Sequence, residues 1–164
     1  MKPDIKAARK QIAACRERGD GLLDLGGLGL DDAALKELLP EIIELPPLKA
    51  LNLGRAGEVD SQSIDLTRHE EKPKKNALHS LPTELIEAQG QLVFLNLRHN
   101  QLAALPDSIG ALAQLQDLRL DGNSLTYPPM EISRQDTKAI VTFLAAVRAD
   151  SEVVPVVRTV FPLR

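Results

Sequence analysis

The leucines in the second half of the chain recur at a fixed spacing. Residues 92–102 read Leu-x-x-Leu-x-Leu-x-x-Asn-x-Leu, and residues 115–125 repeat this pattern at an offset of 23. Alternation of leucine with variable residues predicts a strand with one buried face, because successive side chains of a strand point to opposite sides. The stretch led by Leu105 and Pro106 predicts a return of the chain along the outside. Neighbouring units are therefore expected to stack around a shared leucine core.

Two further copies of the pattern come earlier in the chain. Residues 48–53 begin one copy, but Ala56 stands where asparagine is expected, and the missing half begins at Asn76. Removing residues 56–75 joins the halves into a regular unit. This predicts an insertion at 56–75, expected to project as a mobile loop because it is rich in charged residues and poor in large apolar ones. The first copy, residues 23–30, is predicted to be an atypical terminal unit.

This spacing resembles that of the leucine-rich repeat family, with its bacterial members as the nearest type. The resemblance implies an α/β fold: a short solenoid of about four repeats over residues 22–129, with a parallel β-sheet on its concave face. The recurring Asn76, Asn100 and Asn123 are interpreted as structural. An amide at each bend can satisfy backbone groups of the adjacent turn that would otherwise be buried without partners.

Amphipathic stretches flank the repeats. Apolar residues at helical spacing in 3–18 predict an N-terminal capping helix, with Cys15 on its apolar side. Residues 135–149 show a second apolar stripe and are predicted to form a C-terminal helix. The remaining segment, 150–164, is rich in valine and interrupted by Pro155, so we expect an extended tail. All these parts are expected to form a single domain, residues 1–164.

A narrower resemblance concerns residues 128–144. Pro-Pro-Met-Glu-Ile at 128–132, followed by Gln-Asp-Thr-Lys-Ala-Ile at 135–140 and Phe-Leu at 143–144, is similar to the exit from the repeats in Roco-type proteins. Asp136 stands where those proteins have glycine. In that family this segment joins the repeats to a Ras-like GTPase. The resemblance implies a regulatory repeat fragment of a Roco-like GTPase, with the GTPase itself absent from this chain.

Composition narrows the classes of partner. The 164 residues carry a formal net charge of −3 and a pI of about 5.6, so no overall basic field favours nucleic acid. Aromatic residues make up 2%, which indicates an aliphatic core. The single Cys15 excludes an intrachain disulfide and a cysteine-based zinc site. Because no leader or apolar span can be recognised, we expect a cytoplasmic protein that binds neither nucleic acid nor membrane.

Motifs for catalysis or ligand binding are not found in the sequence. The glycines of residues 26–29 lack the lysine and hydroxyl that end a phosphate-binding loop, and they are followed by acidic residues that would repel phosphate. They are interpreted as a tight turn before a helix N-cap at Asp31 or Asp32. Three histidines fall in no zinc-binding spacing: His69, His79 and His99. We therefore expect no enzyme, no cofactor, no metal and no small-molecule substrate.

Surface recognition remains as the expected function. The variable positions between the strand leucines are predicted to point to the concave face, and Phe94 is one of them. An outward aromatic ring beside arginines has the composition of a binding anchor. The predicted partner-binding residues are Phe94, Asn96, Arg98, His99, Arg119, Asp121, Arg55 and Asn52.

The sequence thus favours a non-catalytic protein–protein interaction module that binds a protein partner through this face and the adjacent insertion. Three alternatives stay open at this point. The chain is a regulatory fragment of a Roco-like GTPase, or a bacterial effector that binds a host protein, or its charged face is simply solvated.

Overall fold

The computed structural model describes residues 2–55 and 75–160. Four short parallel strands form one sheet in chain order. They are β1 (Leu22–Asp24), β2 (Ala50–Asn52), β3 (Phe94–Asn96) and β4 (Asp117–Arg119). The helices are α1 (Ile5–Arg18), α2 (Asp32–Ile43), α3 (Thr83–Ala88), the 3-10 helix η1 (Asp107–Ala111), α4 (Met130–Ser133) and α5 (Thr137–Val160). The predicted α/β class with a parallel sheet is confirmed.

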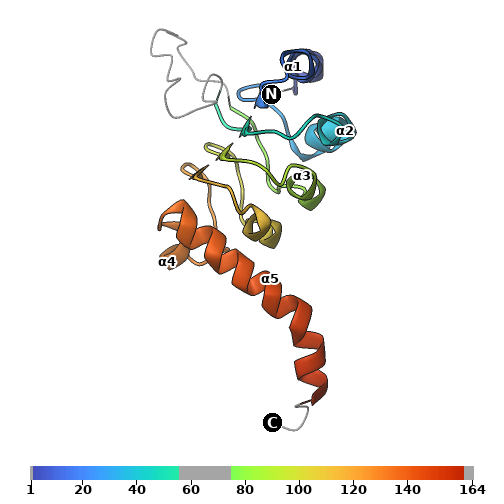
Figure 1. Ribbon diagram of the computed structural model, residues 1–164. Coiled ribbons are helices and arrows are strands. Elements are labelled where there is room, and N and C mark those ends of the chain that lie inside the picture. The colour runs from blue at the N-terminus through green and yellow to red at the C-terminus, as the bar shows by residue number, and fades with distance from the viewer. Residues whose placement is uncertain (1, 56–74, 161–164) are drawn as a thin grey trace.

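The crossover helices lie in a column beside the strands (Figure 1). α2, α3 and η1 each connect one strand to the next, so each of the first three strands is followed by a return on the same side of the sheet. The middle leucines of the four strands are in register: Leu23, Leu51, Leu95 and Leu118. All four are buried in one aliphatic core between the sheet and these helices. The alternation of leucine therefore produces the buried face that the sequence predicts.

The repeated asparagines satisfy backbone groups inside the turns. Asn100 Nδ2 donates to the carbonyls of Leu97 and Leu53, each at 3.0 Å. Asn123 Nδ2 donates in the same way to Leu120 and Leu97, each at 2.8 Å. Each amide thus bonds the carbonyl three residues before it and the equivalent carbonyl of the preceding unit. The predicted structural role of these residues is confirmed.

Asn76 makes the equivalent bonds although a long segment separates it from its strand. Its Nδ2 donates to the carbonyls of Leu53 and Leu25, each at 2.9 Å. Its Oδ1 accepts from the backbone N–H groups of Leu28 and Leu30. The Leu53 carbonyl therefore accepts from Asn76 as the Leu97 carbonyl accepts from Asn100. The insertion predicted at 56–75 lies outside the described residues except for Lys75, but the register on which that prediction rests is present.

The first two helices, α1 and α2, pack together at the N-terminal end of the sheet. α1 packs against α2 and β1, and its stripe of Ala8, Ile12 and Cys15 is buried, as the sequence predicts. Asp4 accepts from the Ala7 N–H at its start, and Gly19 ends it in a left-handed conformation. The N-cap of α2 is Asp31, whose carboxylate accepts from the Ala34 N–H. These caps decide where α1 begins and ends and where α2 begins.

The predicted extended tail at 150–164 is wrong as far as residue 160. α5 continues to Val160, and its second half extends beyond the sheet (Figure 1). A helix already formed adds each residue at little cost, because one hydrogen bond is gained for each residue ordered. The valines lower helix propensity by only tenths of a kcal/mol each, which does not end such a helix. Pro155 predicts an interruption of regular structure, yet it lies inside the helix.

Candidate functional site

The face of the sheet opposite the leucine core is where the sequence places a partner. We call it the polar face. It carries the side chains of Leu22, Asp24, Ala50, Asn52, Phe94, Asn96, Asp117 and Arg119. The two middle strands are buried on this side as well, whereas Asp117 and Arg119 on β4 are half-buried. Direction away from the leucine core is therefore not the same as exposure.

Asn52 and Asn96 are fully buried, so the expectation that they are exposed is wrong. The Asn52 Oδ1 accepts from the Gly54 N–H at 2.9 Å, and the Asn96 Oδ1 accepts from the Arg98 N–H at 3.0 Å. The Asn52 Nδ2 also donates to the Asp24 carboxylate at 2.8 Å. Short polar side chains at strand ends form such turns with the backbone two residues on. These amides hold the turns together instead of presenting polar groups to solvent.

Backbone packing closes the first half of the polar face. A Cβ added at Gly26 would lie 2.1 Å from the carbonyl oxygen of the half-buried Arg55, and one at Gly54 would lie 2.9 Å from the Asn96 Oδ1. Only glycine permits so close an approach. In the next two units the equivalent positions are Arg98 and Asp121, so charged side chains emerge there. The charged side chains beside this face therefore come from β4 and from the turns that follow β3 and β4.

Phe94 lies under an arginine instead of pointing into solvent. Its ring is 6% exposed, and the Arg119 guanidinium carbon is 4.9 Å from the ring centroid. Arg119 Nη2 is also 3.3 Å from the Asp117 Oδ2. Attraction between the cation and the face of the ring, together with the carboxylate, fixes the guanidinium in place. The exposed anchor predicted at Phe94 is therefore corrected: the ring supports Arg119, whose side chain is 18% exposed.

Arg98 and Asp121 form the neighbouring charged pair, with the Arg98 Nε 3.3 Å from the Asp121 Oδ2. The Asp121 side chain is 79% exposed, so the pair contributes little to stability. His99 has a φ of 57° and donates its N–H to the Asp121 carbonyl. A Cβ at Gly122 would lie 2.6 Å from the His99 Nδ1, so glycine makes room for the imidazole. Arg98, His99, Arg119 and Asp121 are thus brought together.

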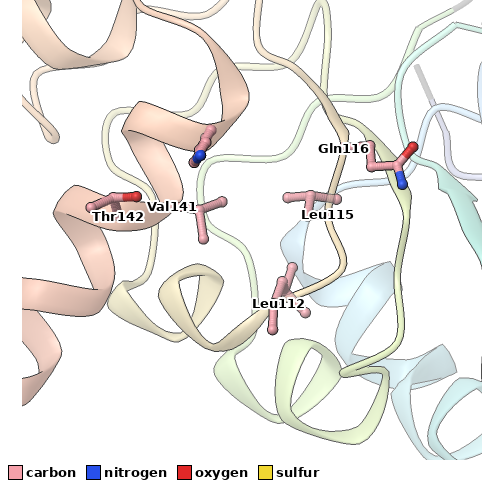
Figure 2. Close-up of a pocket in the computed structure, with 7 residues that line it drawn as sticks. Leu112, Leu115, Gln116, Val141 and Thr142 are labelled. Atoms are coloured by element: carbon pink, nitrogen blue, oxygen red, sulfur yellow. The ribbon is translucent and has the colours of Figure 1, made fainter.

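The start of α5 borders two hollows that the sequence patterns do not reveal. One, of about 470 Å³, lies between α5 and the segment before β4, with Leu112, Leu115 and Val141 around it (Figure 2). The other, of about 460 Å³, lies beside the end of β4 and the α4–α5 connection. Their walls come from segments that are separate in sequence. The one available signal is that β4 is the last strand of the pattern, so no later unit covers its edge.

Tyr127, beside the start of α5, provides a test of this region. Burial and the 2.7 Å hydrogen bond to Asp107 raise the pKa of Tyr127 to about 12. Its pKa in the unfolded chain is about 10. The stabilisation that comes from the protonated hydroxyl is therefore complete below pH 10 and lost as pH rises through 12. We expect the ultraviolet absorbance of tyrosinate, which reports the single tyrosine, to titrate near pH 12 in the folded protein and near 10 in denaturant. A native midpoint near 10 would contradict this environment, and Asp107→Asn is the matched control that keeps an acceptor but removes the charge.

Within residues 2–55 and 75–160, no three His, Cys, Asp or Glu side chains are grouped to hold a metal ion. No helix in the same residues has the length and hydrophobicity needed to cross a membrane. The Cys15 thiol is buried, and burial raises its pKa. A thiol in that state is a poor nucleophile.

The chain shares sequence with a curated protein. That protein is a leucine-rich repeat and calponin homology domain-containing protein of Drosophila melanogaster, 43% identical over 58 residues. This similarity supports a leucine-rich repeat relationship. The match covers 35% of the chain and 7% of the length of that relative, and no family model matches. The Roco-like resemblance of residues 128–144 and the bacterial type stay predictions.

Proposed function

We propose that the chain is a non-catalytic protein-interaction module, built as a short leucine-rich repeat solenoid with α1 and α5 as its terminal caps. Support comes from the repeated parallel strands, the asparagine bonds that recur in three turns, and the similarity to a leucine-rich repeat protein. Stacked units of this kind present one continuous surface whose side chains vary while the core is constant.

The binding surface in this proposal is the β3–β4 part of the polar face. The observation that carries it is the position of Arg119, held between the ring of Phe94 and the carboxylate of Asp117. A guanidinium fixed in this way loses little side-chain entropy when it binds a carboxylate. Arg98 and Asp121 beside it add one charge of each sign. A protein partner with its own acidic and basic groups fits this arrangement.

The sheet alone is small for this task. Four strands of three residues each, about 4.8 Å apart and about 10 Å long, offer about 200 Å². A standard interface buries about 800 Å² on each partner. The proposed partner therefore contacts further surface next to the sheet.

Site-specific photo-crosslinking tests the proposal. The photoreactive residue p-benzoylphenylalanine replaces Asp121 on the polar face, or Glu87 on α3 as a matched acidic position on the other side of the molecule. Both residues are exposed. After irradiation in the cells of origin, we expect the Asp121 variant to form a discrete crosslinked protein that mass spectrometry identifies.

The charge requirement is tested in the same experiment. Arg119→Glu should remove the crosslinked protein, whereas Arg16→Glu on the exposed side of α1 should leave it unchanged. Crosslinking from Glu87 alone, or equally from both positions, would show that the partner does not use this face.

A further inference from the structure

One backbone hydrogen bond recurs along the sheet. Its donor is the leucine that lies two residues after the middle residue of a strand. In three units the N–H of this leucine donates to a carbonyl of the next strand. The pairs are Leu25 to Asn52, Leu53 to Asn96 and Leu97 to Arg119, each at 2.9 Å. Leu120 occupies the same position in the fourth unit. Its N–H has no such acceptor among the described residues, because β4 is the edge of the sheet.

The other outward groups of β4 are only partly satisfied. The Leu118 N–H donates to Thr137 Oγ1 at 3.0 Å, and the Leu120 carbonyl accepts from Asn123 Nδ2 at 2.8 Å. The Leu118 carbonyl and the Leu120 N–H have no hydrogen-bond partner in the part of the chain that the structure describes. In a parallel pair, a single residue aligned with Arg119 bonds both groups. The edge is therefore blocked at its start by Thr137 and open at its end.

The hollow of about 460 Å³ lies against this open end. Its lining residues are Leu118, Arg119, Leu120, Asp121, Ser133, Arg134, Gln135 and Ile140. Two of its charged groups are engaged, since Arg119 pairs with Asp117 and Asp121 pairs with Arg98. Arg134 is exposed and forms no ion pair within the described residues. Among the charged side chains that line the hollow, the one left to pair with a partner is therefore the cation of Arg134.

We propose that the partner adds an extended acidic segment to β4, parallel to it. One residue of the segment donates its N–H to the Leu118 carbonyl and accepts from the Leu120 N–H, and an acidic side chain of the segment pairs with Arg134. Main-chain bonds of this kind supply affinity, while the side chains supply selectivity. The inference rests on the proposed function and specifies the kind of partner segment. It also adds surface next to the sheet, where the polar face alone is too small.

Nuclear magnetic resonance of the full chain tests the pairing. The probe is a blocked pentapeptide of alternating valine and glutamate. We expect saturable shifts of the Leu120 amide, with slower hydrogen exchange at that amide. The same peptide N-methylated at its three central residues lacks the central donors on both of its edges, and it should bind at least about tenfold more weakly, the effect of one good hydrogen bond.

The contribution of the Arg134 charge to peptide binding is tested by a pair of matched variants. Arg134→Glu should weaken binding of the acidic peptide about tenfold, the loss expected for a charge-assisted contact. Arg16→Glu makes the same charge change on α1 and should have no effect. A peptide of alternating valine and lysine should not shift the Leu120 amide.

Two results would overturn the inference. One is an unchanged Leu120 amide at saturating peptide, and the other is equal binding of the N-methylated peptide. If crosslinking from Asp121 still depends on Arg119 in that case, the proposed function stands and only the edge pairing fails. If the edge binds the peptide while crosslinking fails, the polar face is not the partner surface.

Discussion

Asn76→Ala is expected to destabilise the protein by about 4 kcal/mol. The side chain makes four hydrogen bonds, two as donor to Leu25 and Leu53 and two as acceptor from Leu28 and Leu30. Asn76 is 1% exposed, so water cannot replace most of these bonds. A buried backbone group left without a partner costs about 1–3 kcal/mol. The free energy of unfolding, from urea titration followed by circular dichroism, is the measurement.

Asn123→Ala is the matched control for this substitution. Asn123 is half-buried and makes three of the equivalent bonds, with Leu97, Leu102 and Leu120. Its loss should cost about half as much, because water reaches the groups that it leaves. Equal costs at the two positions would show that the deeper burial of Asn76 does not raise the cost of losing its hydrogen bonds.

Gly110→Ala is expected to cost about 2–3 kcal/mol, the usual effect of forcing an atom into a packed interior. A Cβ at Gly110 would lie 2.3 Å from the backbone nitrogen of Ala145 on α5. Backbone cannot rotate out of the way as a side chain can, so α5 must move away from η1. That movement would loosen Ile140 and Leu144, which are buried in the core. Urea titration measures the loss.

Gly90→Ala provides the control, since a Cβ there meets no atom within 4 Å. Its stability should be unchanged within a few tenths of a kcal/mol, or slightly raised because alanine restricts the unfolded chain. If the two substitutions had the same effect, the close contact between η1 and α5 would not exist in solution.

The leucine spacing predicts the core because the buried face of a strand depends only on alternation. Leu95 and Leu97 are fully buried, as expected. Leu120 is only half-buried, because no further unit covers β4. Asn76 shows how strong the pattern is. Its position could be assigned across the insertion because four backbone groups require an amide there, whatever the chain does between.

The candidate site was less predictable, and Phe94 and Asn52 explain why. Alternation places both away from the leucines, but it does not report what lies above them. Arg119 covers the ring of Phe94 from the next strand, and the turn at Arg55 and Gly26 closes over Asn52. Such contacts depend on how closely adjacent units approach. The tail differs from the prediction for a related reason: residues 150–160 resemble an extended segment by themselves, but they continue a helix that already precedes them.

The anchored backbone at Arg55 and Asn76 makes the chain a natural display scaffold. The Arg55 carbonyl accepts from the Asn52 side chain, and Asn76 is anchored by its bonds to Leu25 and Leu53. The departure and the return of the chain are thus fastened independently of the length or composition between them. A foreign peptide, such as an epitope or a randomised library, can be spliced between these two residues without changing the frame of any repeat. The entropic cost of such a graft grows only with the logarithm of its length.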